Sequence, residues 1–310
     1  MAVGSARSSG QRDAGTPRGL WVALRRLPLH VVLIGLVLVW SVPTLALLVS
    51  SFRSPAEIAS DGWWNAFRLP FDFTTENYQE VLSRRGMGRA FVNSLLITIP
   101  STIIPIFVAA TAAYAFSWMR FPARNTLFLI VVGLLVVPLQ MALIPVLRLY
   151  VGLTVDIELP IIGGRVFGTS SYPALWLAHT GFGLPFAVYV LRNFFGSLPR
   201  DLVEAAYIDG ASDWHVFSRI IVPLSRPAIA SLAIFQFLWV WNDLLVALIF
   251  LGDPNLAPMT LSITNLVSSF GTQYQLLTAA AFLSMAMPLA IFFALQRYFV
   301  QGLLAGSVKG

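Results

Sequence analysis

Long apolar segments divide this chain, and they constrain its fold more than any other feature of the sequence. A helix of about 20 apolar residues crosses ~30 Å of hydrocarbon. Within a bilayer the backbone polar groups must be paired internally, which a helix achieves within its own segment. We therefore predict an all-α, polytopic integral membrane protein with six transmembrane helices. The six predicted spans cover about residues 29–50, 91–117, 126–148, 173–195, 228–251 and 277–299.

The composition supports a membrane protein and excludes several other classes. Charged residues make up only 11% of the chain, whereas a soluble domain has about 25%. The absence of cysteine excludes disulfides and thiolate metal sites, and with its histidines far apart in sequence we expect no metal centre. The net charge of +6 does not indicate nucleic-acid binding, because the basic residues lie beside apolar segments and form no basic stripe.

The single lysine, Lys309, lies next to the C-terminus. A phosphate-binding P-loop requires a lysine directly after its glycines, so that the side chain reaches the phosphates of bound ATP. No lysine occupies such a position here. We therefore predict that the chain is not an enzyme and does not hydrolyse ATP itself.

The distribution of arginine predicts the topology. Arginines occur in the N-terminal tail, between spans two and three, and in the 192–226 loop, whereas the loop at 252–276 has no lysine or arginine. Both termini and the 192–226 loop are therefore predicted to be cytoplasmic. Loop one also contains five arginines yet must lie outside, which conflicts with the rule. We expect a small external element there, with a helix beginning at 77–82.

Three regions follow from these predictions. Residues 1–27 are polar and rich in Arg, Gly and Ser, which predicts a flexible cytoplasmic tail. Residues 28–300 form the transmembrane domain. Residues 301–310 form a C-terminal cytoplasmic tail, whose glycines favour an extended backbone over a helix.

A polar segment between spans four and five predicts two short helices. Pro199 suits the first turn of a helix, Gly210 suits its end, and Ser212 can cap a second helix that runs to Pro223. An ordinary amphipathic helix lying on lipid is the alternative, with Leu202, Val203 and Trp214 as its apolar face.

The same segment resembles the "EAA" loop of ATP-binding-cassette (ABC) importer permeases. The family pattern is Glu-Ala-Ala, three residues, Gly, nine residues, Ile, one residue and Leu-Pro. This chain matches every element except the leucine, which is Val222. The resemblance implies that the loop at 197–226 couples the permease to an ATPase. The residues implied in this coupling are Glu204, Ala205, Ala206, Asp209, Gly210, Ala211 and Pro223.

Two further segments resemble the carbohydrate class of ABC importer permeases, and most closely its smaller maltose-type subunit. The first is Phe237-Leu238-Trp239-Val240-Trp241-Asn242-Asp243 in span five. The second is the glycine-rich ending Gln301–Gly310. The resemblance implies that this tail contacts the ATPase through Gly302, Gly306 and Lys309.

The resemblance implies a division of labour among several subunits. An extracytoplasmic binding protein would deliver a sugar, and this chain would form the path with a second permease, as a heterodimer in the inner membrane. Two ATPase subunits would bind ATP and Mg, and this chain would hold no cofactor. A permease for amino acids, peptides or phosphate is one alternative. An ion-coupled secondary transporter is another, although only Asp243 offers a carboxylate within a span.

Polar groups inside the predicted spans are candidates for the substrate path, because such groups are costly in lipid and usually face a cavity. Hydrogen bonding between helices is the alternative for Asn242 and the glutamines, and a place in the outer aromatic belt is the alternative for the tryptophans. The candidates are Asn242, Asp243, Trp241, Trp239, Gln236 and Gln140.

Overall fold

The computed structural model describes residues 18–69, 71–152, 155–158, 165–167, 169–270 and 273–307. Four helical segments are long and apolar enough to cross a membrane: Leu27–Ser51, Met87–Trp118, Tyr172–Phe195 and Tyr274–Gln296. Two bent pairs pass the same criterion, Arg124–Val136 with Leu139–Gly152 at 105° and Asp213–Leu224 with Arg226–Trp241 at 75°. The described part therefore has four spans, or six if each bent pair is one span, and the predicted helical membrane fold is confirmed.

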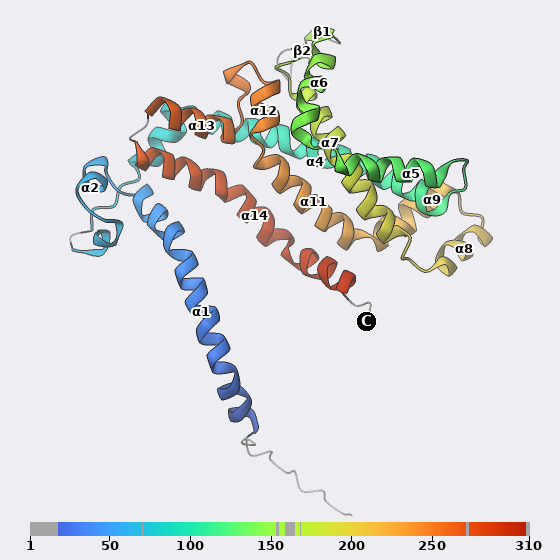
Figure 1. The fold of residues 1–310 in the computed structure, drawn as a ribbon, viewed down its shortest axis with the longest axis horizontal. Helices are drawn as coiled ribbons and strands as arrows, with labels where there is room; N and C mark the ends of the chain where they lie inside the picture. Colours follow the sequence, from blue (N-terminus) through green and yellow to red (C-terminus); the bar gives the residue numbers. More distant parts are fainter. Residues whose placement is uncertain are drawn as a thin grey trace, which may run out of the picture.

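The first half of the chain contains two long helices. Helix α1 (Arg18–Ser51) contacts α14 but otherwise runs away from the other helices, whereas α4 (Met87–Trp118) packs against α7 and α11 (Figure 1). The elements between them are α2 (Pro55–Ser60), η1 (Trp63–Phe67), α3 (Glu76–Gln79) and the π-helix η2 (Glu80–Arg84). The elements after α4 are α5 (Arg124–Gly133), η3 (Leu134–Val136), α6 (Leu139–Gly152), β1 (Val155–Glu158) and β2 (Arg165–Phe167).

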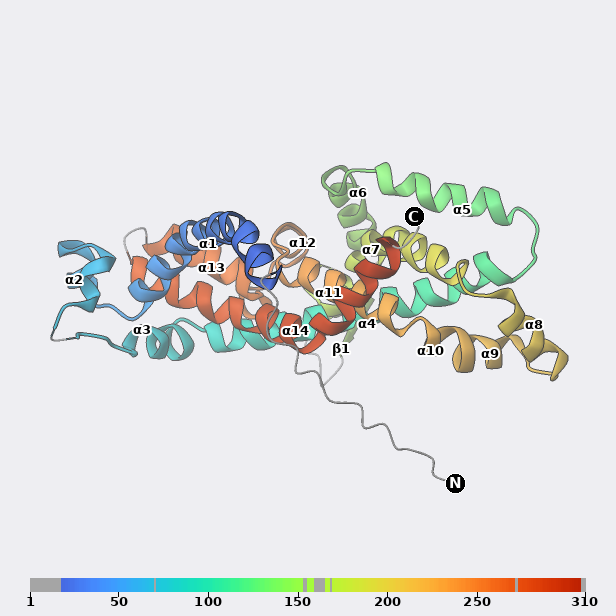
Figure 2. The ribbon, with the colours of Figure 1, turned by 90° about the horizontal axis from the view of Figure 1, so that it is seen from below.

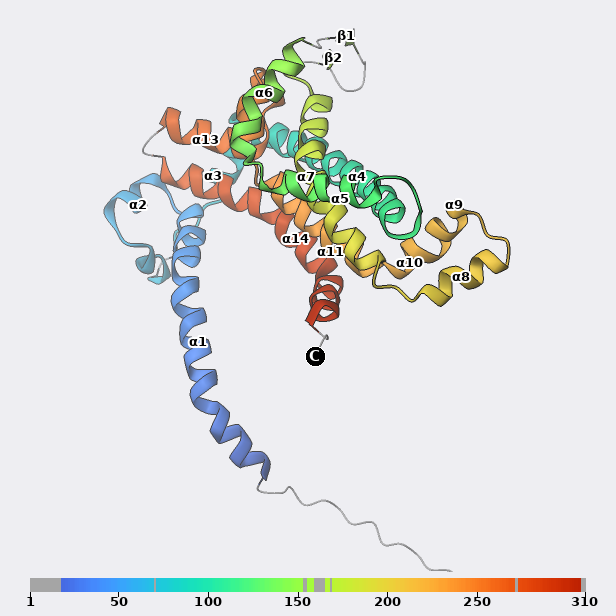
Figure 3. The same cartoon turned by 45° about the vertical axis from the view of Figure 1, so that its right-hand side comes forward.

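In the second half, α11 lies alongside α14 (Figures 1 and 3). The chain passes through α7 (Tyr172–Phe195), α8 (Arg200–Ile208), α9 (Asp213–Val216), the π-helix η4 (Phe217–Ile221) and α10 (Val222–Leu224). It continues through α11 (Arg226–Trp241), α12 (Leu245–Phe250), η5 (Pro254–Leu256), α13 (Met259–Phe270) and α14 (Tyr274–Ser307).

Small side chains let α4 and α7 pack closely. Ala109, Ala113 and Ala187 are buried in one cluster with Leu191 and Phe195. Small residues at a helix interface bring the backbones together and favour dispersion contacts, which drive helix association in lipid. The α4–α7 pair therefore forms the rigid centre on which the other elements are arranged.

Loop one is a folded element, as predicted, and its arginines have structural contacts. Arg53 is buried, and its guanidinium donates to the carbonyls of Glu57 and Asp61 at 3.0 and 3.3 Å. Arg85 forms an ion pair with Glu80 at 2.8 Å. These contacts give Arg53 and Arg85 a structural role in loop one, which the topology rule does not take into account.

Several structural predictions need correction. Span three is not one helix over 126–148, because the chain bends by 105° between Val136 and Leu139. Span five is not one helix over 228–251, because α11 ends at Trp241 and α12 begins at Leu245. The bent apolar pair that ends at Trp241 begins earlier, at Asp213. Loop three contains a two-stranded antiparallel ribbon, β1–β2, in addition to turns. Helix α1 begins at Arg18 and so covers the end of the predicted tail, while residues 1–17 lie outside the described residues.

The C-terminal tail is not extended over residues 301–307, because α14 continues to Ser307. A glycine in a helix interior costs about 1 kcal/mol relative to alanine. Leu303, Leu304 and Ala305, which are strong helix formers, lie between the two glycines and favour the helix. Residues 308–310 lie outside the described part.

The two ends of the molecule are formed by different sets of short helices. Helices α8 and α9 lie at one end, and α2 with α3 lies at the other (Figure 2). The loop between α4 and α5 lies close to α8, since its residues line a common cavity. The end that carries α8 and α9 therefore holds the residues of the predicted coupling loop.

Candidate functional site

Helix α8 ends in a complete Schellman motif at Gly210. The N–H of Gly210 donates to the carbonyl of Tyr207 at 3.1 Å, and the N–H of Ala211 donates to the carbonyl of Ala206 at 2.9 Å. Gly210 has φ of +81°, a left-handed conformation that costs a residue with a side chain about 1–2 kcal/mol. The glycine therefore fixes how the chain leaves α8, as the sequence predicted.

The second helical part of the loop is also capped as predicted. The Ser212 hydroxyl accepts a hydrogen bond from the N–H of His215 at 3.3 Å. The helical run then continues through η4 to Leu224, and the chain turns by 75° into α11. The element formed by α8, α9, η4 and α10 (residues 200–224) is named the coupling loop below.

The apolar side of the coupling loop packs on the ends of α4 and α7. Val203, Val216 and Ile221 are buried in the same cluster as Ala113 and Leu191. Val203 therefore faces protein, which differs from the alternative in which it lies on lipid, whereas Leu202 and Trp214 are exposed. A displacement of the coupling loop would be passed directly to these two spans.

A hydrogen-bonded cluster joins the coupling loop to α4. The Tyr207 hydroxyl donates to an Asp213 carboxylate oxygen at 2.6 Å and lies 3.1 Å from the Tyr114 hydroxyl. Burial first, and then the hydrogen bond to Asp213, raises the pKa of Tyr207, so the phenol stays a donor at neutral pH. Sequence reasoning missed this cluster, because Tyr114 is 93 residues from Tyr207 in the chain.

The outward side of the coupling loop carries the residues of the family pattern. Glu204, Ala205, Asp209 and Gly210 are exposed, and Ala206 and Ala211 are half-buried. Pro223 lies in α10, where it is also half-buried. The small side chains of Ala205 and Ala206 leave the backbone of α8 open to close approach by another surface.

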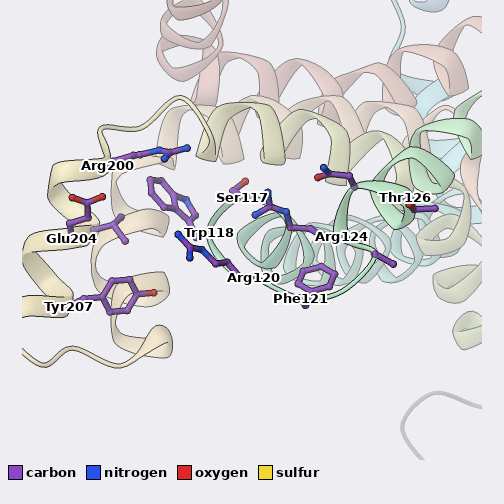
Figure 4. A pocket seen from close by; sticks show the side chains of 12 residues that line it. Ser117, Trp118, Arg120, Phe121, Arg124, Thr126, Arg200, Glu204 and Tyr207 are labelled. Atoms are coloured by element: carbon purple, nitrogen blue, oxygen red, sulfur yellow. The ribbon is translucent and has the colours of Figure 1, made fainter.

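Two cavities flank this exposed side. One of about 540 Å³ lies between α8 and α9, and Ala206, Asp209 and Gly210 line it. The other, of about 770 Å³, lies between α8 and the loop after α4, with Glu204 and Tyr207 on its α8 side (Figure 4). The coupling loop is therefore a ridge between two hollows, a shape suited to docking in a complementary cleft.

The break in span five places Asn242 and Asp243 outside regular helix. Asn242 is the C-cap residue that follows α11, and its exposed amide donates to the carbonyl of Leu238 at 2.7 Å. The Asp243 carboxylate accepts from the N–H of Val246 at 3.0 Å and so caps α12. Irregular backbone inside a membrane protein is tolerated where it is buried in protein or lines a cavity.

Asp243 also faces a buried histidine that the sequence did not pair with it. The Nε2 atom of His179 lies 3.9 Å from the Asp243 carboxylate, and His179 is only 1% exposed. The ring of Trp239, which is partly exposed, packs edge-on against His179 at 5.8 Å between centroids. Asp243, His179 and Trp239 therefore form one polar group where α11 meets α7.

The other substrate-path candidates are scattered. Trp241 is 2% exposed, stacks on Phe237 at 5.6 Å and donates to the carbonyl of Ser284 at 3.0 Å. Gln236 is buried and donates to the carbonyl of Ser101 at 3.2 Å. Trp241 and Gln236 thus have helix-packing contacts. Gln140 is exposed near the start of α6 and is not part of this group.

The loop after α12 is held rigidly by α4, which the sequence did not indicate. The Asn93 amide donates to the carbonyls of Asn255 and Ala257 at 2.8 and 3.0 Å. The Tyr172 hydroxyl donates to the Asn93 carbonyl oxygen at 2.8 Å. Asn93 therefore satisfies three partners at once and fixes the loop against α4 and α7.

The structure describes only part of the predicted tail contacts. Gly302 and Gly306 lie in α14, and Lys309 lies outside the described residues. Among the residues that the structure describes, no group of three or more His, Cys, Asp or Glu could hold a metal ion.

Comparisons with known proteins agree with this geometry. Residues 106–304 match the model of the family described as "Binding-protein-dependent transport system inner membrane component". The matched region includes the whole coupling loop, all of α7 and α11, most of α14 and the last part of α4.

Two relatives and one solved structure extend the comparison. "Osmoprotective compounds uptake permease protein GgtD" of Synechocystis is 53% identical over 92% of this chain and 93% of its own length. "Alpha-glucoside transport system permease protein AglG" of Rhizobium meliloti is 57% identical over 78% of this chain, but the match covers only 62% of that relative. A chain of a crystal structure titled a bacterial ABC transporter involved in the import of alginate has a TM-score of 0.73 at 18% identity, covering 94% of this chain and 100% of that one, which supports the fold alone.

Proposed function

Because this chain belongs to the family of binding-protein-dependent transport system inner membrane components, we propose that it is the permease subunit of an ATP-driven sugar importer. The observation that carries the proposal is the coupling loop, whose apolar side is packed on α4 and α7 and whose Glu204–Gly210 side is exposed. ATP hydrolysis in partner subunits that bind ATP and Mg would move this loop. The movement would then reach the spans through their shared buried cluster.

The names of the relatives favour a sugar over other solutes. The AglG relative is named for alpha-glucosides, and another relative at 32% identity is named for diacetylchitobiose. The GgtD relative is named for osmoprotective compounds. We therefore propose a sugar or a small glycoside as the substrate, delivered by an extracytoplasmic binding protein. A binding screen of that protein should compare α-glucosides with non-sugar osmoprotectants, and selective binding of the latter would contradict the sugar class.

The assembly and the topology are part of the same proposal. We propose that a second permease completes the path. The apolar side chains that α1 exposes, including Trp40 at 84%, would lie against lipid or against that subunit. We also propose that both termini and the coupling loop are cytoplasmic. The arginines at residues 120, 124, 192, 200, 219 and 226 support that placement.

The test uses the complex reconstituted with its ATPases, second permease and binding protein. Glu204→Ala should abolish the stimulation of ATP hydrolysis by the substrate-loaded binding protein while the permease still inserts. Asp72→Asn, an exposed acid in loop one, is the matched control and should leave stimulation unchanged. Full stimulation in the Glu204 variant would refute the proposed role of the coupling loop.

A further inference from the structure

The larger of the two cavities beside the coupling loop has a strong positive bias. Its lining includes three arginines, Arg120, Arg124 and Arg200, but Glu204 is its single acid (Figure 4). Arg120 lies on the loop that joins α4 to α5, Arg124 begins α5, and Arg200 begins α8. Three guanidinium groups from two separate segments therefore surround one hollow of about 770 Å³.

These arginines are not neutralised by the protein around them. Within the residues that the structure describes, neither Arg120 nor Arg200 makes an ion pair, and both are exposed. Arg124 donates to the carbonyl of Met119 at 3.0 Å, which stabilises the turn but leaves its charge unpaired. The guanidinium group matches phosphate in geometry, because its planar N–H groups can donate to two oxygens at once.

The position of the cavity selects the kind of anion. It begins at Trp118, the last residue of the α4 span, and its lining includes the aromatic side chains of Trp118 and Phe121. Tryptophans at the end of a span, such as Trp118, are typical of the level of the lipid headgroups. Arginines beside the cytoplasmic end of a span are attracted to the anionic lipids of that leaflet.

We propose that this cavity binds the phosphate of an anionic phospholipid headgroup from the cytoplasmic leaflet, held by Arg120, Arg124 and Arg200. The proposal rests on the cytoplasmic placement of the coupling loop. A headgroup at this position would contact both α8 and the α4–α5 loop. The lipid would thereby brace the coupling loop against the membrane and link the rate of transport to lipid composition.

The experiment measures lipids retained by the purified, fully assembled complex, with native mass spectrometry. The complex is equilibrated in nanodiscs that contain phosphatidylglycerol and phosphatidylcholine. Each arginine near a headgroup contributes about a fivefold effect on binding, so Arg120→Gln with Arg124→Gln should reduce retention of phosphatidylglycerol roughly 30-fold. Arg219→Gln with Arg226→Gln, two other exposed arginines of the same loop region, should leave it unchanged.

Three outcomes would overturn the proposal. Displacement of the lipid by inorganic phosphate, with no preference for phosphatidylglycerol, would indicate a site for a free anion. Unchanged lipid retention together with loss of the ATPase subunits would assign the arginines to the ATPase interface. Unchanged retention with intact assembly would show that the cavity holds no lipid, and it would leave the proposed transport function untouched.

A second measurement keeps the proposal testable if the double variant does not assemble. A photoreactive phosphatidylglycerol is crosslinked to the unmodified complex, and the labelled peptide is identified. Labelling within residues 117–126 supports the site, and labelling confined to other segments overturns it.

Discussion

The Schellman turn at Gly210 makes a quantitative prediction about coupling. Its φ of +81° is strained for any residue with a Cβ, yet a Cβ built there meets no atom within 4 Å. Substitution therefore changes only the backbone energy and causes no clash within the chain. Ala destabilises this turn by about 1–2 kcal/mol, which lowers the ratio of the native turn to its alternatives by roughly 5- to 30-fold. Asn tolerates the left-handed region, whereas β-branched Val is a genuine outlier there.

The assay is binding-protein-stimulated ATP hydrolysis by the reconstituted complex. We expect the stimulated ATPase rate to be nearly normal in Gly210→Asn, lower in Gly210→Ala and lowest in Gly210→Val. The loss of rate in Gly210→Ala should reach at most roughly 30-fold. Gly181→Ala is the control, because Gly181 also has free space but an ordinary φ. Equal activity in the Asn and Val variants would refute the reasoning from backbone strain. If both were equally impaired, Gly210 would be needed for close approach of the ATPase.

Three further predictions test other parts of the structure. Asn93→Leu leaves the Tyr172 hydroxyl and two carbonyls without a partner, so it should lower the free energy of unfolding by about 2–3 kcal/mol, measured by thermal denaturation in detergent; an unchanged Tm would contradict the role of Asn93. Asn242→Leu should reduce uptake of labelled sugar while assembly is preserved, and failure to assemble would make Asn242 a packing residue. Deletion of residues 303–310 should change the ATPase rate more than the amount of protein in the membrane, and an unchanged rate would count against a role for the tail.

Much of the fold can be predicted from hydropathy and from residues that are close in sequence. Apolar segments long enough to span a bilayer predicted the helices, and Gly210 and Ser212 predicted the two ends within the coupling loop. These features depend on residues that are close in sequence, such as the bond from His215 to Ser212. Local hydrogen bonding and hydropathy are sufficient for that level of description.

The remaining features depend on contacts between distant segments. The break in span five follows from the capping of α12 by Asp243 and from the bond of Thr260 to the Asp243 carbonyl at 2.7 Å. The hydropathy of the sequence does not reveal the break, because apolar residues flank it on both sides. The Tyr114–Tyr207 contact likewise requires knowing that α4 and α8 meet. Only Asp243, a carboxylate within an apolar run, offered a signal of these contacts in the sequence.

Direct contact between the exposed side of α8 and an ATPase subunit is the central claim, and site-specific crosslinking tests it. The chain has no cysteine, so Ala205→Cys introduces a unique attachment point for a photoreactive probe. In the assembled complex the probe at residue 205 should form a covalent product with the ATPase, and a probe at Asp72→Cys in loop one should not. Absence of that product from a complex whose other subunits are present, or its appearance only from residue 72, would contradict the proposed coupling.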